Sequence, residues 1–290
     1  MTRSPAGQST SASMHALVRD GVEARVGATP DGLSKRELLQ RLPVPHDAFE
    51  IGTGVKAWGE HPVLRAVSSA PNPASLLSRW QSIEAFGHTS HRTRTVFADE
   101  RRVELEHVSL DGGPISAVQD LLIWGVVAGL FELWGATHVV LEWPDGGRFG
   151  APRDQGTTRT VSVHLGRSKR AQPPGIPKDT PSMAAVQAVV QTDLLHSWVL
   201  REVAARLRVS DRSLQRRLRA EAVTFSSVLQ RTRVDAAVKL LRSTELGLTE
   251  IAFCTGFSDH AHLTRTTRKH MELPPSGLRA LLRASSSQQD

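Results

Sequence analysis

The sequence predicts two domains, an α+β domain followed by an all-α domain. The chain has 290 residues, which is enough for two domains at ~150 residues each. A segment over residues 166–181, GRSKRAQPPGIPKDTP, is too rich in proline and glycine to form a helix or a central strand. Residues before it show both helical and alternating patterns, whereas residues after it show helical spacing alone.

The boundaries follow from these changes of pattern. We expect disorder over residues 1–14, the α+β domain over 15–165, a linker over 166–181, the helical domain over 182–285 and a short tail over 286–290. Within the first domain, helices are predicted over 34–42, 73–86 and 115–134, and strands over 94–98, 103–108, 138–143 and 158–165. The last strand is expected to return antiparallel to the one before it.

The most apolar helix, over 115–134, is expected to be buried in a globular domain. Its uninterrupted apolar run, 121–131, has 11 residues, whereas a membrane span needs about 20. The N-terminus has no apolar run typical of a signal peptide. A single cysteine, Cys254, excludes a disulfide framework and a cysteine-based zinc site. We therefore expect a cytoplasmic protein without membrane contact, and we interpret Cys254 as a packed helix residue.

Positive charge is concentrated at the C-terminal end. Residues 191–290 carry 16 Lys and Arg against 10 Asp and Glu, a net charge of +6 out of +7 for the whole chain. A compact basic segment beside a nearly neutral one favours a polyanionic partner such as nucleic acid.

The same region contains an internal repeat. LREVAARLRVSD begins at Leu200 and LTEIAFCTGFSD begins at Leu248, and five of the aligned residues are identical at an offset of 48. Past the Ser-Asp pair the second copy has one extra residue, so Leu214 aligns with Leu263 at an offset of 49. Each copy predicts a helix, a tight turn and a second helix, with Ser210 and Ser258 at the N-caps.

This arrangement is typical of a helix-turn-helix, whose second helix enters the major groove of DNA and exposes donors and acceptors to the base edges. Arginine can pair with guanine through two hydrogen bonds, and glutamine with adenine. The side chains expected to contact DNA are Arg212, Gln215, Arg216 and Arg219 in the first copy, and His260, His262, Arg265 and Arg268 in the second. A helix over 225–243, ~27 Å long, would hold the copies about one DNA turn apart.

The region resembles the AraC/XylS family of bacterial transcription regulators. The resemblance is carried by three segments: VSDRSLQRRLRAE, the helix with Arg233 and Leu241, and LTEIAFCTGFSDHAHLTRTTRKHMELPPSGLR. It implies an AraC-type DNA-binding domain over 182–285, with helix-turn-helix motifs at about 200–221 and 248–271. It also implies double-stranded DNA and RNA polymerase as partners, and a possible homodimer.

The sequence also departs from the family pattern at several positions. The family often has glycine where Ala222 and Glu272 stand, so the turns after both second helices are expected to differ. It usually has an aromatic residue at Thr267 and another at His270 or Met271, so the second motif is expected to pack less tightly.

By the same resemblance, the first domain is expected to be a sensor that binds an unknown small-molecule effector or dimerises. The residues considered for an effector pocket are Trp80, His88, His91, Arg92, Arg94 and His107. His88 and His91 lack the further ligands of a convincing metal site, so we expect no metal and no cofactor. No catalytic motif stands out and no enzyme activity is expected. A small-molecule enzyme fused to a DNA-binding domain, or a constitutive DNA binder without effector, are the alternatives.

Overall fold

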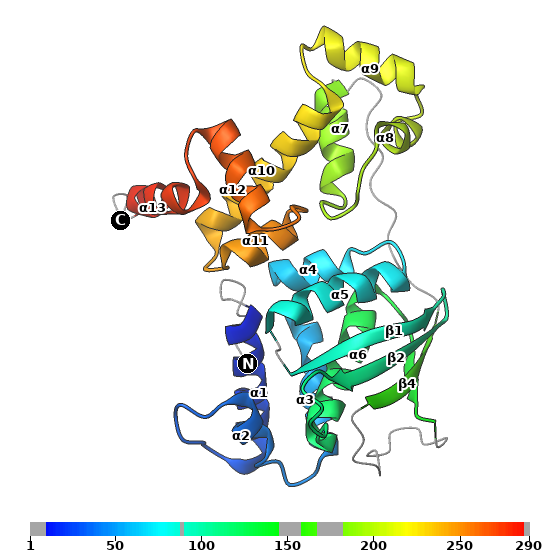
Figure 1. Cartoon of the computed structure of the whole chain (residues 1–290), viewed down its shortest axis with the longest axis vertical. Helices are drawn as coiled ribbons and strands as arrows, with labels where there is room; N and C mark the ends of the chain where they lie inside the picture. The colour runs from blue at the N-terminus through cyan, green and yellow to red at the C-terminus, as the bar shows by residue number, and fades with distance from the viewer. Residues whose placement is uncertain (1–9, 88–89, 145–157, 167–181, 287–290) are drawn as a thin grey trace. The chain divides into compact units, whose positions relative to one another are not determined.

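The computed structural model describes residues 10–87, 90–144, 158–166 and 182–286. The chain divides into two compact units, Met1–Arg170 and Ala171–Asp290, called here the N-terminal and C-terminal units. The first contains a sheet and the second is helical, which confirms the predicted fold class in its coarse form (Figure 1).

The N-terminal unit combines helices with one antiparallel sheet. Its helices are α1 (Thr10–Val26), α2 (Lys35–Leu39), α3 (His46–Thr53), the short 3-10 helix η1 (Gly54–Trp58), α4 (Pro62–Ser68), α5 (Pro73–Gly87) and α6 (Ala117–Trp134). The strands β1 (His91–Ala98), β2 (Arg102–Ser109), β3 (Val139–Glu142) and β4 (Thr158–Leu165) pair in the order β1-β2-β4-β3. Each neighbouring pair is antiparallel, as expected for β3 and β4.

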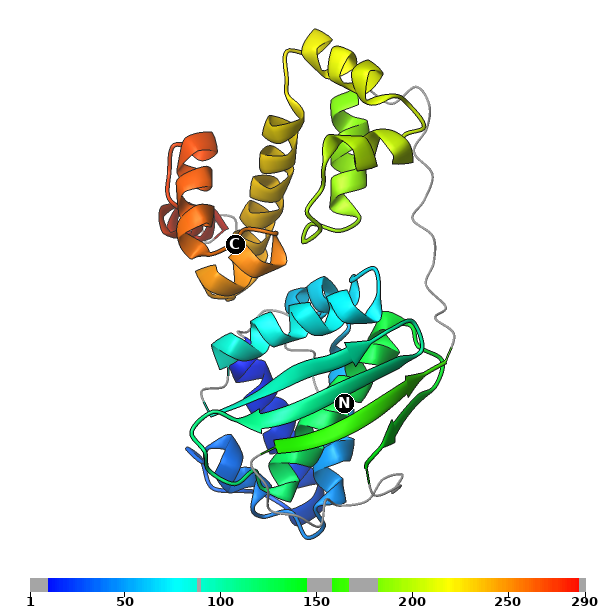
Figure 2. The same ribbon diagram turned by 45° about the vertical axis from the view of Figure 1, so that its right-hand side comes forward.

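One face of this sheet covers the core. Val103, Leu105 and His107 alternate along β2 and are buried, as are Val161 and Val163 on β4. Figure 2 shows the sheet along one side of this unit with α6 behind it. The period-2 pattern of the sequence therefore identifies the buried face correctly.

Helix α6 is the centre of the N-terminal unit. It is long and apolar enough to cross a membrane by length and composition, but 72% of it is buried inside the fold, as expected for a core helix. It is packed backbone to backbone against α3. A Cβ atom on Gly125 would lie 2.1 Å from the carbonyl oxygen of Phe49, and one on Gly52 would lie 2.3 Å from that of Leu122. Both glycines are required for this contact.

The N-terminal boundary differs from the prediction. Residues 10–14 belong to α1, and Ser13 and Met14 are buried, so the expected disorder over 1–14 is wrong for these five residues. Residues 1–9 lie outside the described part of the chain. Helix α1 was missed because its apolar positions, among them Val18 and Val22, are too sparse to form a strong helical pattern.

The C-terminal unit has seven helices in its described part. They are α7 (Ser182–Gln191), α8 (Leu200–Arg206), α9 (Asp211–Ala220), α10 (Phe225–Ser243), α11 (Leu248–Cys254), α12 (His260–Met271) and α13 (Pro275–Ser286). Helix α10 packs against α7, α11, α12 and α13, and Figures 1 and 2 both show α9 and α12 at opposite ends of it. Residues 167–181, most of the expected linker, and 287–290 of the tail lie outside the described residues.

Candidate nucleic-acid interface

Helix α9 has one buried and one exposed face. The Ser210 hydroxyl caps it by accepting a hydrogen bond from the Ser213 amide at 3.2 Å, as predicted. Leu214 and Leu218 are buried in a core with Val203 and residues of α7. The candidates on the other face, Arg212, Gln215, Arg216 and Arg219, are all exposed. None of these arginines forms an ion pair with another residue that the structure describes, so their charges are available to an external anion.

Helix α12 is capped one residue later than expected. The cap is Asp259, whose carboxylate accepts a hydrogen bond from the His262 amide at 2.6 Å, so the prediction of Ser258 as the cap is wrong. The extra residue of the second copy explains this. At the offset of 49 that aligns Leu214 with Leu263, Ser210 aligns with Asp259.

This offset changes which residues of the two copies correspond. Arg265 and Arg268 align with Arg216 and Arg219 and are exposed, whereas His262 aligns with Ser213. His262 is half-buried; its Nδ1 lies 3.1 Å from the Ser258 hydroxyl and its ring meets Phe257 edge to face. Of its two ring nitrogens, Nδ1 is therefore already engaged within the second helix pair. His260, the first residue of α12, is exposed.

The turn within the second helix pair is packed against the first half of the unit. Gly256 has φ of +76°, and a Cβ atom there would lie 2.0 Å from the carbonyl oxygen of Leu194. Arg233 on α10 donates to the carbonyl oxygens of Leu194 at 3.2 Å and His196 at 3.0 Å. Burial lowers the pKa of Arg233, although a guanidinium remains charged. These contacts tie the segment before α8 to α10 and to the α11–α12 turn.

The turns after α9 and α12 keep a left-handed conformation without glycine. Ala222 has φ of +56° and Glu272 has φ of +61°, values that glycine adopts most readily. The chain therefore accepts local strain at both turns, and the expectation that these turns differ from those of the family stays a prediction.

A long-range cap next to the first of these turns was not visible in the sequence. The Glu221 carboxylate accepts hydrogen bonds from the amides of Ser182, at 2.8 Å, and Met183, at 2.9 Å. It thereby satisfies the first amides of α7, where a negative charge is favourable. Ser182 and Glu221 are 39 positions apart in the sequence, so no local pattern could have indicated this contact.

Among the residues considered for an effector pocket, the structure brings two to one cavity. His91 and His107 line a cavity of about 460 Å³ in the N-terminal unit, and their ring centres are 5.4 Å apart. Trp80, Arg92 and Arg94 do not line it. Trp80 is buried, while Arg94 donates to the Glu106 carboxylate at 3.0 Å on the outer face of the sheet. His88 lies outside the described residues.

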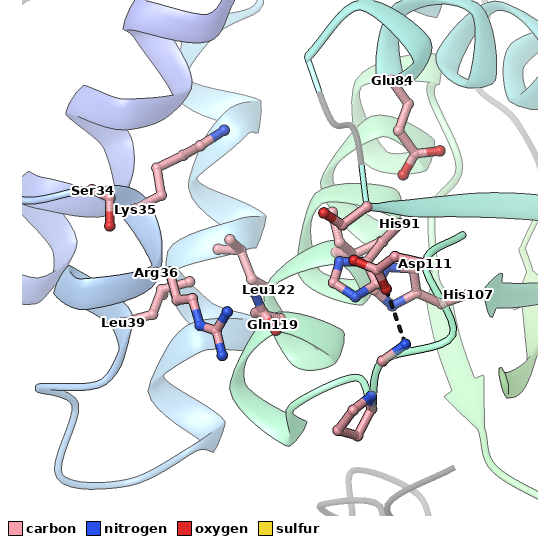
Figure 3. Close-up of a pocket in the computed structure, with 14 residues that line it drawn as sticks. Ser34, Lys35, Arg36, Leu39, Glu84, His91, His107, Asp111, Gln119 and Leu122 are labelled. Atoms are coloured by element: carbon pink, nitrogen blue, oxygen red, sulfur yellow. Dashed lines mark hydrogen bonds between the residues drawn. The ribbon is translucent and has the colours of Figure 1, made fainter. Parts of the chain in front are cut away.

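Sequence reasoning missed several residues of this cavity. Lys35 and Arg36 on α2, and Glu84 on α5, line it together with the two histidines (Figure 3). Asp120, in the first turn of α6, lies behind His107 and accepts a hydrogen bond from its Nδ1 at 2.9 Å. No cluster of three metal-binding side chains occurs among the described residues. Periodicity alone could not bring together residues from α2, α5, β1 and β2.

Cys254 is buried and unlinked. Burial raises the pKa of its thiol far above the usual value, which disfavours the thiolate that reacts with oxidants or alkylating agents. This supports the interpretation of Cys254 as a packed residue.

The exposed basic helices place the C-terminal unit in the helix-turn-helix class of DNA-binding proteins, and a family model described as a helix-turn-helix domain matches residues 203–280. The C-terminal part of the chain is an AraC-type DNA-binding domain, which confirms the predicted resemblance.

Three similar proteins illustrate the match. The transcriptional regulator SirC of Salmonella typhimurium is 31% identical over 90 residues, 31% of this chain and 30% of SirC. The transcriptional activator AggR of Escherichia coli is 29% identical over 90 residues, 31% of this chain and 34% of AggR. A solved AraC-type regulator from Chromobacterium violaceum has 23% identity, a TM-score of 0.34, and coverage of 35% of this chain and 92% of that one. The match spans about a third of the length of these curated relatives, which are transcriptional regulators.

Proposed function

We propose that the chain is a sequence-specific transcriptional regulator whose α8–α9 and α11–α12 pairs are two helix-turn-helix motifs joined by α10. The observation that carries this proposal is the exposed basic face of α9, which has no ion-pair partner in the described part of the chain. Such a face binds phosphates and base edges in a major groove. The exposed Arg265 and Arg268 give α12 the same capacity.

The two helices would contact successive major-groove segments. On α9, Arg212, Gln215, Arg216 and Arg219 are the proposed contacts, and on α12 they are His260, His262, Arg265 and Arg268. Arg216 and Arg265 occupy equivalent positions, six residues past their caps at Ser210 and Asp259. Both are therefore proposed to contact bases.

The N-terminal unit is proposed to bind a small-molecule effector in the cavity beside His91 and His107, and so to control DNA binding or contact with RNA polymerase. A homodimer and a cytoplasmic location belong to the same proposal. The chain is proposed not to be an enzyme. Conversion of a metabolite by the purified protein would contradict that part alone.

The experiment is DNase footprinting on sites found by genome-wide mapping of bound DNA. We expect a protected site of about two major-groove segments per chain. Arg216→Ala should weaken specific binding by about 1–3 kcal/mol and relax base preference at one position. Arg65→Ala, the same change at an exposed residue of the N-terminal unit, is the matched control and should have no effect.

Two results would contradict the proposal. The first is the absence of any protected site, which would indicate a non-specific binder. The second is an equal loss of affinity for specific and random DNA in Arg216→Ala, which would limit this arginine to phosphate contact.

A further inference from the structure

The cavity of the N-terminal unit contains a buried imidazole with one unused nitrogen. His107 is 1% exposed and lines the cavity. Its Nδ1 bonds to the buried carboxylate of Asp120 at 2.9 Å, and its ring is held edge to face by Trp124. Its Nε2 is buried and has no hydrogen-bond partner within the described part of the chain. A buried polar atom without a partner is costly, so this atom indicates a place for a ligand group.

The bond to Asp120 also determines what Nε2 can do. A carboxylate accepts the proton on Nδ1, and in that tautomer Nε2 is the acceptor nitrogen of the ring. The matching ligand group is a hydrogen-bond donor, such as a hydroxyl or an amino group.

The opposite wall of the cavity is cationic. Lys35 and Arg36, at the start of α2, line the cavity across from the histidines (Figure 3). Neither side chain has an ion pair or hydrogen bond to any residue placed by the structure. Burial lowers the pKa of Lys35, which means that its charge is partly desolvated and uncompensated. An anionic group beside it would remove this cost.

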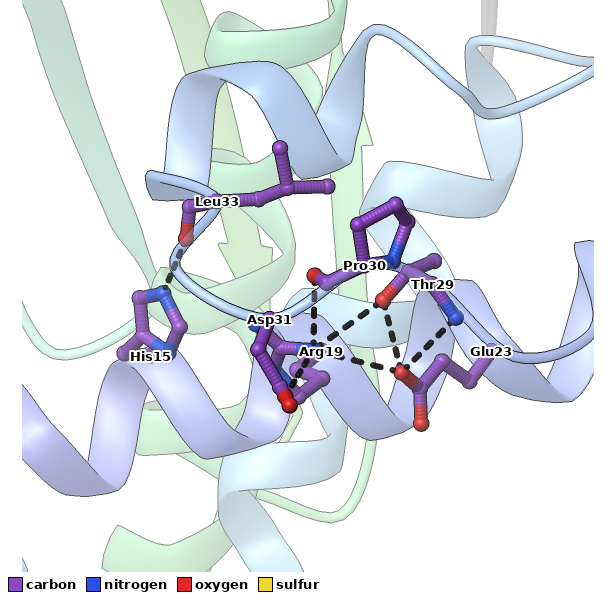
Figure 4. A network of polar contacts seen from close by, with 7 residues as sticks. All are labelled: His15, Arg19, Glu23, Thr29, Pro30, Asp31 and Leu33. Carbon is purple, nitrogen blue, oxygen red and sulfur yellow. Dashed lines mark hydrogen bonds and ion pairs between the residues drawn. The ribbon is translucent and has the colours of Figure 1, made fainter.

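Helix α2 is held in position by the segment before it and by its own capping box at Ser34, which also lines the cavity. Glu23 on α1 accepts hydrogen bonds from the Thr29 hydroxyl at 2.6 Å and amide at 3.2 Å, while Arg19 donates to the Pro30 carbonyl oxygen at 3.3 Å (Figure 4). The Ser34 hydroxyl and the Glu37 carboxylate form a capping box at the start of α2. Lys35 and Arg36 are thus presented by a braced segment, as a preorganised site requires.

The acidic residues of the cavity hydrogen-bond to neighbouring groups and form no ion pair with Lys35 or Arg36 in the described part of the chain. Glu84 accepts hydrogen bonds from the Thr93 amide and hydroxyl, both at 2.7 Å. Asp111 accepts from the Gly113 amide at 3.0 Å and the Ser109 hydroxyl at 2.8 Å. Both lie on the same side as the histidines (Figure 3), where they favour a ligand group that donates hydrogen bonds. The cavity therefore has an anion-binding side and a donor-binding side.

We propose that this cavity binds a small organic acid whose carboxylate contacts Lys35 and Arg36 and whose hydroxyl or amino group donates to Nε2 of His107. This deepens the proposed effector function and rests on it. The volume of about 460 Å³ lies near the lower end of small-molecule sites. Leu39, Leu122 and Ile123 line the same space and accommodate an aliphatic body between the two polar ends.

The test is isothermal titration calorimetry on the full chain with three sets of probes: 3-hydroxy acids (3-hydroxybutyrate, 3-hydroxyhexanoate), α-amino acids (alanine, leucine) and the amide of each acid, which keeps the carbon skeleton of that acid. We expect one class of acid to bind and its amide to bind about tenfold or more weakly, as the loss of a charge-assisted hydrogen bond requires. The class that binds shows whether the donor is a hydroxyl or an amino group.

Two variants test the residues. Lys35→Met should weaken binding of the acid about tenfold or more, whereas Arg41→Gln, an exposed cation of the neighbouring segment that does not line the cavity, should leave it unchanged. His107→Asn leaves Asp120 without its partner and can unfold the unit, so Lys35→Met is the deciding variant.

Absence of binding by every acid, or equal binding by acid and amide or by wild type and Lys35→Met, would overturn the ligand assignment. Footprinting of the same samples keeps the two proposals separate. If the protein protects its DNA site but binds no acid, only the cavity proposal is contradicted. If it binds an acid but protects no DNA site, the proposed function as a sequence-specific regulator is contradicted.

Discussion

At the scale of single residues, Thr267 stands out in the second helix pair. It aligns with Leu218 at the offset of 49 and, like Leu218, is buried, but its hydroxyl has no hydrogen-bond partner in the described structure. The core of the second helix pair thus contains an unsatisfied hydroxyl at the position where the core of the first pair contains the apolar side chain of Leu218.

Thr267→Val should therefore stabilise the C-terminal unit by about 1 kcal/mol, because it removes a buried hydroxyl and keeps the shape of the side chain. Urea denaturation followed by circular dichroism measures this. Thr264→Val is the control on the same helix. It should bring no gain in stability, because the Thr264 hydroxyl already donates to the His260 carbonyl oxygen at 2.8 Å. A loss of stability in Thr267→Val would show that the hydroxyl is satisfied.

A second residue-scale prediction concerns the left-handed turn after α9. Ala222→Gly should raise the free energy of unfolding by about 1 kcal/mol, because glycine has no Cβ to strain the backbone at φ of +56°. Ala205→Gly, on an exposed position of α8 with ordinary helical backbone, should lower it by a similar amount. Equal destabilisation of both variants would mean that the turn is not strained.

At the scale of elements, the α11–α12 turn fixes how the two helix pairs are joined. Gly256→Ala would place a methyl group against the Leu194 carbonyl oxygen in a backbone conformation unfavourable to alanine, so we expect a loss of about 3 kcal/mol or more. Gly277→Ala on α13 meets no atom closer than 3.6 Å and should stabilise its helix by about 1 kcal/mol. Thermal unfolding of both variants compares them. An unchanged melting temperature in Gly256→Ala would show that the turn is free to move.

Elements with a strong local pattern were predictable, and those set by distant partners were not. The alternation along β2, the apolar run of α6 and the repeat at Leu200 and Leu248 each gave the correct element. The Ser258 cap was placed wrongly because a serine and an aspartate stand side by side there and both can cap a helix. The Glu221 contact with α7 and the pairing of His107 with Asp120 depend on the fold, and no spacing in the sequence indicates them.

At the scale of the whole molecule, the two units have separate cores. We expect residues 183–290 alone to fold as a helical domain and to bind DNA, since the core around Val203 and Leu214 contains residues of this region only. Circular dichroism and gel-shift titration of the fragment test this, and affinity should fall steeply with salt through counterion release. A helical fragment that fails to bind the site of the full chain, or binds it equally at all salt concentrations, would contradict the prediction.

The different side chains at equivalent positions of α9 and α12 have a consequence for the proposed DNA target. Helix α9 exposes two arginines and a glutamine at positions where α12 has Ala261, Thr264 and Arg265. Under the proposed contacts, a duplex that fits both surfaces carries different base pairs in its two halves, so it has a defined polarity. Each molecule bound there would face one way along the chromosome, and inverting the site beside a promoter would reverse the face turned towards the start of transcription.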